Sequence, residues 1–167
     1  FFWWRNYSDF GTGVAGDLFV HLLSGIHLVT DSLGPKTIFA SGQLCYWKDG
    51  RDVPDVMTAV MQYPESKEHP AFQVMLRVNF VSGLGEKGVT RFIGSEGALE
   101  MLDNGFSLTH SIMSKAPGIG GWDAIYSYPQ AMQDELMKQY DLKYTAEDRK
   151  RPEVPGVTYV APEEYDE

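Results

Sequence analysis

The fold is decided by the stretch Gly11-Thr-Gly-Val-Ala-Gly-Asp17-Leu-Phe-Val-His21-Leu-Leu-Ser-Gly-Ile-His27-Leu-Val-Thr-Asp-Ser-Leu33, a glycine-rich loop that enters an apolar helix. We expect the helix to run over 17–33 and to end at Gly34-Pro35, because glycine leaves the helical conformation and proline cannot continue it. Apolar residues cover most of its surface, which predicts a largely buried helix. We expect it to pack on a sheet through Leu18, Leu22, Ile26 and Val29.

The rest of the chain favours strands joined by short turns. The clearest strand is 72–81, where apolar residues alternate with Gln, Met, Arg and Asn, as in a strand with one wet face. An α+β fold follows, with a large, mostly antiparallel open sheet and helices on one face, in a single domain over 1–167. We expect strands at 1–7, 36–47, 56–63, 72–81, 89–93, 98–102 and 106–111, a helix at 129–140, and an irregular tail over 145–167.

Composition limits the possible partners. The net charge of −9 argues against binding to nucleic acid or to an anionic membrane, and no apolar run is long enough to span a bilayer. The single Cys45 excludes an internal disulfide and multi-cysteine metal sites, and it leaves the cellular compartment open. The apolar start Phe1-Phe-Trp-Trp4 predicts that the chain is a piece of a longer protein.

Gly11, Gly13 and Gly16 match the spacing of a dinucleotide-binding loop, and Asp31 lies near the distance of a ribose-binding acid. The context argues against that function. The residues before the loop are too polar for a central parallel strand, and Asp17 places a carboxylate where a pyrophosphate would bind. We therefore predict no dinucleotide site in this loop.

Asp17 and His21 are one helical turn apart. A histidine is a suitable general base near neutral pH, and a carboxylate one turn away can orient its ring. The alternative is a structural pair, since such spacings are common on helices. Metal-ligand motifs such as His-Glu-x-x-His are absent from the sequence.

Several aromatic residues are candidates for substrate binding, and each also has a structural interpretation. Trp3, Trp4 and Arg5 could stack on a sugar or polyol, or belong to the core. Trp122 follows the flexible stretch 117–121 and could cover a cleft or anchor the loop. The stretch Asp49-Gly-Arg-Asp52 is most simply a solvated hairpin turn.

The order of motifs over roughly residues 1 to 110 resembles the C-terminal domain of the Gfo/Idh/MocA family of NAD(P)-dependent oxidoreductases. The motifs, in chain order, are Trp-Trp-Arg-Asn-Tyr7, Gly-Asp17-x-x-x-His21, Leu-Gly-Pro35, Asp49-Gly-Arg-Asp-Val-Pro-Asp55, Tyr-Pro64 and Gly94-Ser-Glu-Gly-Ala-Leu99. The resemblance implies a glyceraldehyde-3-phosphate-dehydrogenase-like C-terminal domain that contacts substrate, while a separate Rossmann domain binds NAD or NADP. It also implies a homo-oligomer formed through the open sheet face.

In that family His21 would be the acid/base and Asp17 its orienting partner. We assign Trp4, Arg5, Asn6 and Trp122 to substrate binding. Ser24 stands where the family often has an acid, so the substrate is expected only as a sugar, polyol or related compound. The family's Glu-Lys-Pro motif is absent from these residues, which predicts that the isolated chain is inactive.

Two other functions stay open from the sequence. One is an NAD-dependent glycosidase on the same scaffold, which would turn over a glycoside without net NADH production. The other is a non-catalytic assembly domain in which Asp17 and His21 are structural. Solvent-inaccessible side chains at both positions would favour the assembly domain.

Overall fold

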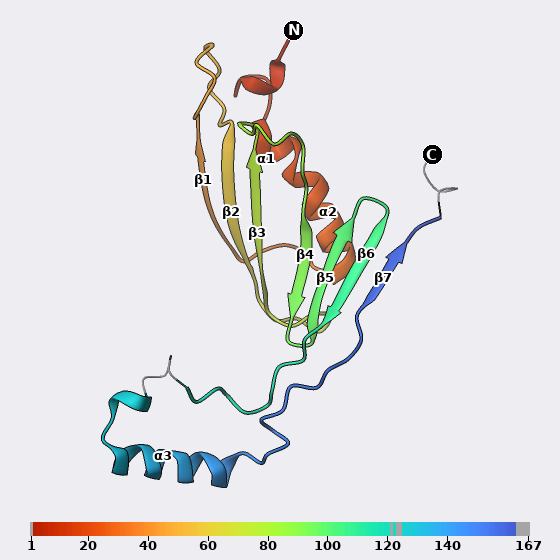
Figure 1. Cartoon of the computed structure of the whole chain (residues 1–167). Helices are drawn as coiled ribbons and strands as arrows, with labels where there is room; N and C mark the ends of the chain where they lie inside the picture. The colour runs from red at the N-terminus through yellow and green to blue at the C-terminus, as the bar shows by residue number, and fades with distance from the viewer. Residues whose placement is uncertain (1, 121, 123–124, 163–167) are drawn as a thin grey trace. The chain divides into compact units, whose positions relative to one another are not determined.

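The computed structural model describes residues 2–120, 122 and 125–162 (Figure 1). It contains two antiparallel sheets and a few helices, which confirms the predicted α+β class. The strands pair in a three-stranded and a four-stranded sheet rather than in one large sheet. Contacts group the chain into two compact units, Phe1–Glu86 and Lys87–Glu167, and each is described by itself. A single domain over 1–167 stays a prediction.

The first unit is built on the sheet β1-β2-β3, with β1 at Thr37–Gln43, β2 at Val56–Tyr63 and β3 at Phe72–Asn79. Both pairs are antiparallel, with Phe39 opposite Val60 and Val60 opposite Met75. The residues that alternate with Val60 on β2 and with Met75 on β3 point to the other face of the sheet, which forms the core of the unit. That face consists of Met57, Ala59, Met61 and Tyr63 on β2, with Phe72, Val74, Leu76 and Val78 on β3.

The helix predicted over 17–33 is shorter in the structure, and a second, short helix precedes it. Gly13–Asp17 forms α1 and Phe19–Thr30 forms α2, with Leu18 between them. The second helix ends where Asp31 takes the left-handed conformation at φ 53° and Ser32 donates its N–H to the carbonyl of His27. This is a Schellman-type ending. It satisfies the terminal carbonyls before the chain reaches Gly34-Pro35, so the helix stops earlier than predicted.

The buried face of α2 differs from the prediction. Phe19 is buried in the core of the first unit, and Leu23 and Ile26 pack against the same cluster. These positions are spaced as one helical stripe. Of the predicted packing residues only Ile26 belongs to it, while Leu22 and Val29 are exposed. The expectation of a largely buried helix is also wrong, because Phe19 is the one buried residue among the described side chains of α2.

The predicted strand over 1–7 is absent from residues 2–7. Trp4–Asn6 forms a short 3-10 helix, η1, which follows Trp3 in the left-handed conformation at φ 57°. Such a conformation turns the chain sharply and is incompatible with a continuous strand. The turn leads into Gly11, where an added Cβ would lie 3.2 Å from the ring of Trp4.

The second unit contains the sheet β4-β5-β6-β7. Strands β4 at Thr90–Gly94, β5 at Gly97–Leu102 and β6 at Gly105–His110 form the predicted succession of hairpins. Val157–Val160 adds β7, antiparallel to β6, inside the stretch predicted to be an irregular tail. The tail is therefore partly a strand, and its place in the sheet is fixed by pairing with a distant segment.

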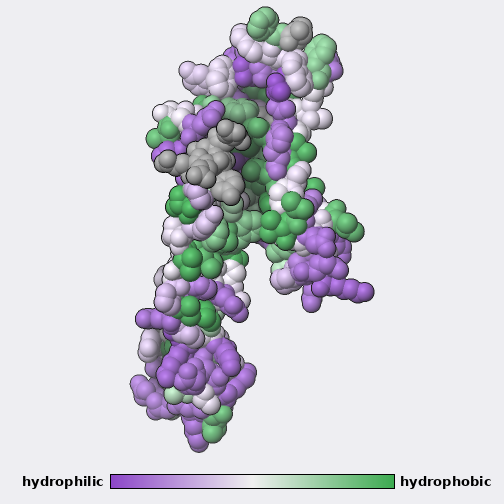
Figure 2. Space-filling view, turned by 90° about the vertical axis from the view of Figure 1, so that its right-hand side faces the viewer, coloured by the Kyte–Doolittle hydropathy of each residue, from purple (hydrophilic) through white to green (hydrophobic). Residues whose placement is uncertain are grey.

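Between β6 and β7 the chain forms η3 at Ile125–Ser127 and α3 at Gln130–Lys143, with Pro129 as the N-cap. The helix confirms the prediction over 129–140. None of its residues is buried, and in Figure 2 the lowest part of the molecule, which holds α3, is mainly hydrophilic. Tyr140 ties it to the preceding loop by donating its hydroxyl to the carbonyl of Pro117 at 2.7 Å. In the described part of the chain, no helix is long and apolar enough to cross a membrane.

Candidate functional site

Three of the predicted site residues meet at the start of the first unit. The Nε atom of Arg5 lies 2.6 Å from Oδ2 of Asp17, and the Arg5 guanidinium lies over the Trp4 ring, 4.4 Å from its centroid. Stacking on an indole and pairing with a carboxylate are two favourable uses of a planar guanidinium. The turn at η1 thus brings the Trp4-Arg5 stretch against the end of α1.

His21 lies in the first turn of α2 and is exposed. Its backbone N–H donates to the carbonyl of Leu18 at 3.2 Å, which starts α2 after the break. Among the contacts of the described residues, none joins the His21 ring to the Asp17 carboxylate. In this structure Asp17 orients Arg5, and the imidazole remains open to solvent.

The two other predicted substrate-binding residues are Asn6 and Trp122, each described within its own unit. Asn6 is half-buried, and its backbone carbonyl accepts the N–H of Asp52 at 3.2 Å. Trp122 belongs to the second unit and is fully exposed. The structure therefore connects Asn6 to the β1–β2 loop, while a role for Trp122 in the same site stays a prediction.

The β1–β2 loop, residues 44–55, is organised around a buried carboxylate. Asp55 is 2% exposed and accepts the backbone N–H groups of Cys45, Tyr46 and Trp47 at 2.7, 2.9 and 3.3 Å. Burial alone would raise the pKa of the Asp55 carboxyl, but these donors outweigh it and hold the pKa below its usual value. A buried carboxylate that binds successive N–H groups fixes the loop backbone.

The tip of this loop is more ordered than the solvated turn that the sequence predicts. Arg51 forms a two-point ion pair with Asp49, from Nε to Oδ1 at 2.8 Å and from Nη2 to Oδ2 at 2.6 Å. The Arg51 guanidinium also lies over the Trp47 ring, 4.6 Å from its centroid, and only 13% of its side chain is exposed. Hydrogen bonding from Arg51 lowers the pKa of the Asp49 carboxyl to about 2. These contacts hold the Arg51 side chain between Asp49 and Trp47.

The glycine loop has packing contacts of its own. Gly13 has φ +62°, and an added Cβ would lie 3.1 Å from Cβ of the buried Val53. Gly11 is pressed against Trp4 in the same way. Side chains of the same unit therefore occupy the space where a Cβ would stand at these glycines, which gives Gly11 and Gly13 a packing role.

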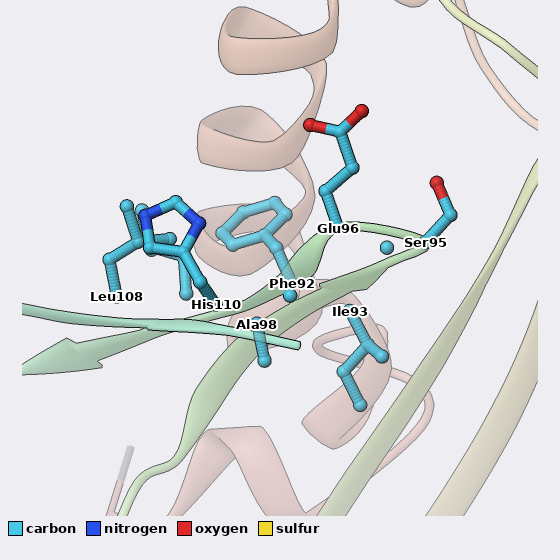
Figure 3. A pocket seen from close by; sticks show the side chains of 10 residues that line it. Phe92, Ile93, Ser95, Glu96, Ala98, Leu108 and His110 are labelled. Atoms are coloured by element: carbon cyan, nitrogen blue, oxygen red, sulfur yellow. The ribbon is translucent and has the colours of Figure 1, made fainter. Parts of the chain in front are cut away.

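The second unit holds an open hollow of about 460 Å³ beside the β4–β5 turn. Figure 3 shows Phe92, Leu108 and His110 on one side of the sheet together with Glu96, while Ile93 and Ala98 point to the other side. The volume is that of a small-molecule site. No hydrogen bond among the described residues joins His110 to Glu96, so the hollow lacks a paired acid and base.

Comparisons with known protein families, with curated proteins and with solved structures find no match. Within residues 2–120, 122 and 125–162, no three His, Cys, Asp or Glu side chains gather as metal ligands would. The Arg5–Asp17 pair with the exposed His21 is therefore the candidate site that the contacts support best. Sequence reasoning missed Asp55, which binds the backbone of Cys45, Tyr46 and Trp47, and Asp52, which binds Ser8 and Asn6.

Proposed function

We propose that this chain is the substrate-binding half of an NAD(P)-dependent oxidoreductase that acts on a sugar, polyol or related compound. The observation that carries the proposal is the Arg5–Asp17 ion pair, which joins two of the motifs on which the resemblance rests and lies close in sequence to an exposed His21. A guanidinium stacked on an indole offers a hydrogen-bonding edge and an apolar face, the two features that a polyol needs.

His21 would take the hydroxyl proton of the substrate. An exposed imidazole is accessible to a bound ligand and can exchange that proton with water. The nicotinamide cofactor, which accepts the hydride, would be held by a separate domain, as the resemblance implies. Arg5, held by Asp17 and Trp4, would bind substrate hydroxyl groups, since a guanidinium donates in a fixed planar geometry.

Exposure favours this proposal over a purely structural pair. The Asp17 side chain is 38% exposed and His21 is exposed, whereas an assembly domain that used both as internal ties would bury them. The ion pair of Asp17 with Arg5 nonetheless changes the expected division of roles. Asp17 supports the substrate-binding arginine rather than the imidazole.

The test is NAD(P)⁺ reduction by the protein that carries this chain, followed by absorbance over a panel of sugars and polyols. We expect net reduction with at least one compound, and loss of most of it in His21→Gln. His69→Gln, which changes a histidine in the β2–β3 loop, is the matched control and should retain activity. Glycoside turnover without net reduction would instead indicate the glycosidase, and no turnover of either kind would contradict the proposal.

A further inference from the structure

Asp52 connects the β1–β2 loop to the segment that carries Arg5. Its carboxylate accepts the backbone N–H of Ser8 at 2.8 Å and the Ser8 hydroxyl at 2.5 Å. Its own backbone N–H donates to the carbonyl of Asn6 at 3.2 Å. Three hydrogen bonds from one residue therefore hold the chain immediately after Arg5.

The β1–β2 loop, which carries Asp52, is held by contacts of two other residues, Asp55 and Val53. Asp55 binds three successive backbone N–H groups on the first arm of the loop. Val53 is buried against Gly13 at the start of α1, the helix that ends in Asp17. Because neighbouring residues of one loop contact both the Asn6–Ser8 segment and α1, the loop sets the distance between the two partners of the ion pair.

We propose that Asp52 is a positioning residue that holds Arg5 against Asp17. The inference rests on the proposed function, since it concerns the substrate-binding arginine of that site. The hydrogen bonds from Ser8 lower the pKa of the Asp52 carboxyl, so Asp52 is ionised near neutral pH and binds these donors as a carboxylate. Asp52 touches no reacting group in this arrangement, and it acts through the backbone of residues 6–8.

Asp49 provides a matched control in the same loop. Asp49 is three positions before Asp52 and forms its ion pair with Arg51. The guanidinium of Arg51 in turn stacks on the Trp47 ring. The three hydrogen bonds that reach Asn6 and Ser8 come from Asp52. Asp49→Ala therefore removes a carboxylate and an ion pair from the loop while leaving these three hydrogen bonds in place.

The ion pair can be followed directly by NMR on the 167-residue chain. The Nε–Hε cross-peak of Arg5, assigned with Arg5→Lys, reports the ion pair with Asp17, whose Oδ2 lies 2.6 Å from Nε, and Asp17→Ala supplies the position of the peak when that ion pair is absent. In Asp52→Ala we expect the peak to move most of the way to the Asp17→Ala position. In Asp49→Ala it should stay at the wild-type position. Asp52→Asn retains an acceptor for Ser8, so in this variant the Arg5 cross-peak should lie between the wild-type and the Asp17→Ala positions.

Steady-state kinetics supply the second readout. In the protein that oxidises a polyol, Asp52→Ala should lower kcat/KM about tenfold, the effect of losing hydrogen bonds to a charged group, and Asp49→Ala should leave it near the wild-type value. If Asp52→Ala does not fold, Ser8→Ala, which removes only the hydroxyl donor, gives the same comparison.

An Arg5 cross-peak that is unmoved in Asp52→Ala, or identical in wild type and Asp17→Ala, would overturn the inference. A wild-type protein without turnover would contradict the proposed function, but the NMR comparison would still test whether Asp52 holds Arg5 against Asp17. The two failures are therefore distinguishable.

Discussion

The imidazole of His27 meets the phenol of Tyr63 edge-on, with Nε2 of the histidine 2.8 Å from the tyrosine hydroxyl oxygen. Tyr63 is 2% exposed and stacks on Phe72 at a centroid distance of 4.4 Å. Burial raises the pKa of Tyr63, so the phenol stays neutral and keeps its proton. This contact ties the last turns of α2 to the end of β2.

Tyr63→Phe tests the contribution of this hydrogen bond. The ring and its stacking on Phe72 are retained, and only the hydroxyl is lost. We expect the free energy of unfolding to fall by about 0.5–1.5 kcal/mol, the usual net value of one hydrogen bond, measured by urea denaturation. Tyr46→Phe, at an exposed loop tyrosine, should change stability little. An equal loss in both variants would show that the His27 contact contributes nothing of its own.

Asp55 predicts how stability depends on pH. Its pKa is lowered in the folded chain, so the unfolded chain binds the proton at higher pH. The stabilisation is complete above the ordinary aspartate pKa of about 4, and it is lost as the pH falls through the lower folded value. Asn has one acceptor oxygen in place of two, so Asp55→Asn should be less stable than wild type at pH 7.

The difference between the two proteins should shrink as the pH falls below about 4, because wild type then loses its carboxylate as well. Denaturant titrations at neutral and acid pH measure it. Asp9→Asn, at an exposed aspartate of the same unit, is the control and should follow wild type at both pH values. A difference that is constant with pH would contradict ionisation of Asp55 as the cause.

The strands of the first unit could be predicted because local signals specify them. β2 spans 56–63 as predicted, since its alternation is closed by Pro64, and β3 begins at Phe72 as predicted. β7 could not be found in this way. Val157-Thr-Tyr-Val160 is too short to show a period, and it becomes a strand by pairing with β6.

The buried face of α2 was beyond sequence reasoning for a different reason. Apolar residues lie all round the helix, so the pattern does not identify the side that meets the sheet. The site shows the same limit. The spacing of Asp17 and His21 predicts a pair on one helix, but Leu18 interrupts the helix, and the turn at η1 brings Arg5 to the carboxylate instead. Such contacts depend on where the chain turns rather than on local periodicity.

Phe19→Ala separates the observed face of α2 from the predicted one. Phe19 is 3% exposed in the core, whereas Val29, a predicted packing residue, is 72% exposed. We expect Phe19→Ala to destabilise the chain by about 3–5 kcal/mol through loss of buried surface and the cavity left behind. Val29→Ala should cost less than about 1 kcal/mol. Thermal or urea unfolding of the two variants decides between the two faces of α2. A larger loss of stability in Val29→Ala than in Phe19→Ala would favour the predicted face.

The face of the sheet β1-β2-β3 opposite the core of the first unit predicts self-association. Phe39, Val60 and Met75 lie opposite one another across the three strands, and Phe39 and Met75 are exposed. An apolar row on an open sheet face is typical of an interface between identical copies. We expect an oligomer by light scattering, and Met75→Glu should shift it toward monomer. Met113→Glu makes the same substitution at an exposed site outside the sheet and should leave the oligomer intact. A wild-type monomer at high concentration would contradict the interface.

His21→Gln is the decisive variant for the proposed chemistry, made in the protein that turns over the substrate. Glutamine keeps a polar side chain of similar size but cannot act as a base. Because His21 is exposed, the fold and the thermal midpoint should be retained. We expect kcat to fall by roughly 10²–10⁴, the usual contribution of a positioned acid or base, with little change in substrate affinity. A variant that matches wild type at saturating substrate would show that His21 carries no proton in the reaction.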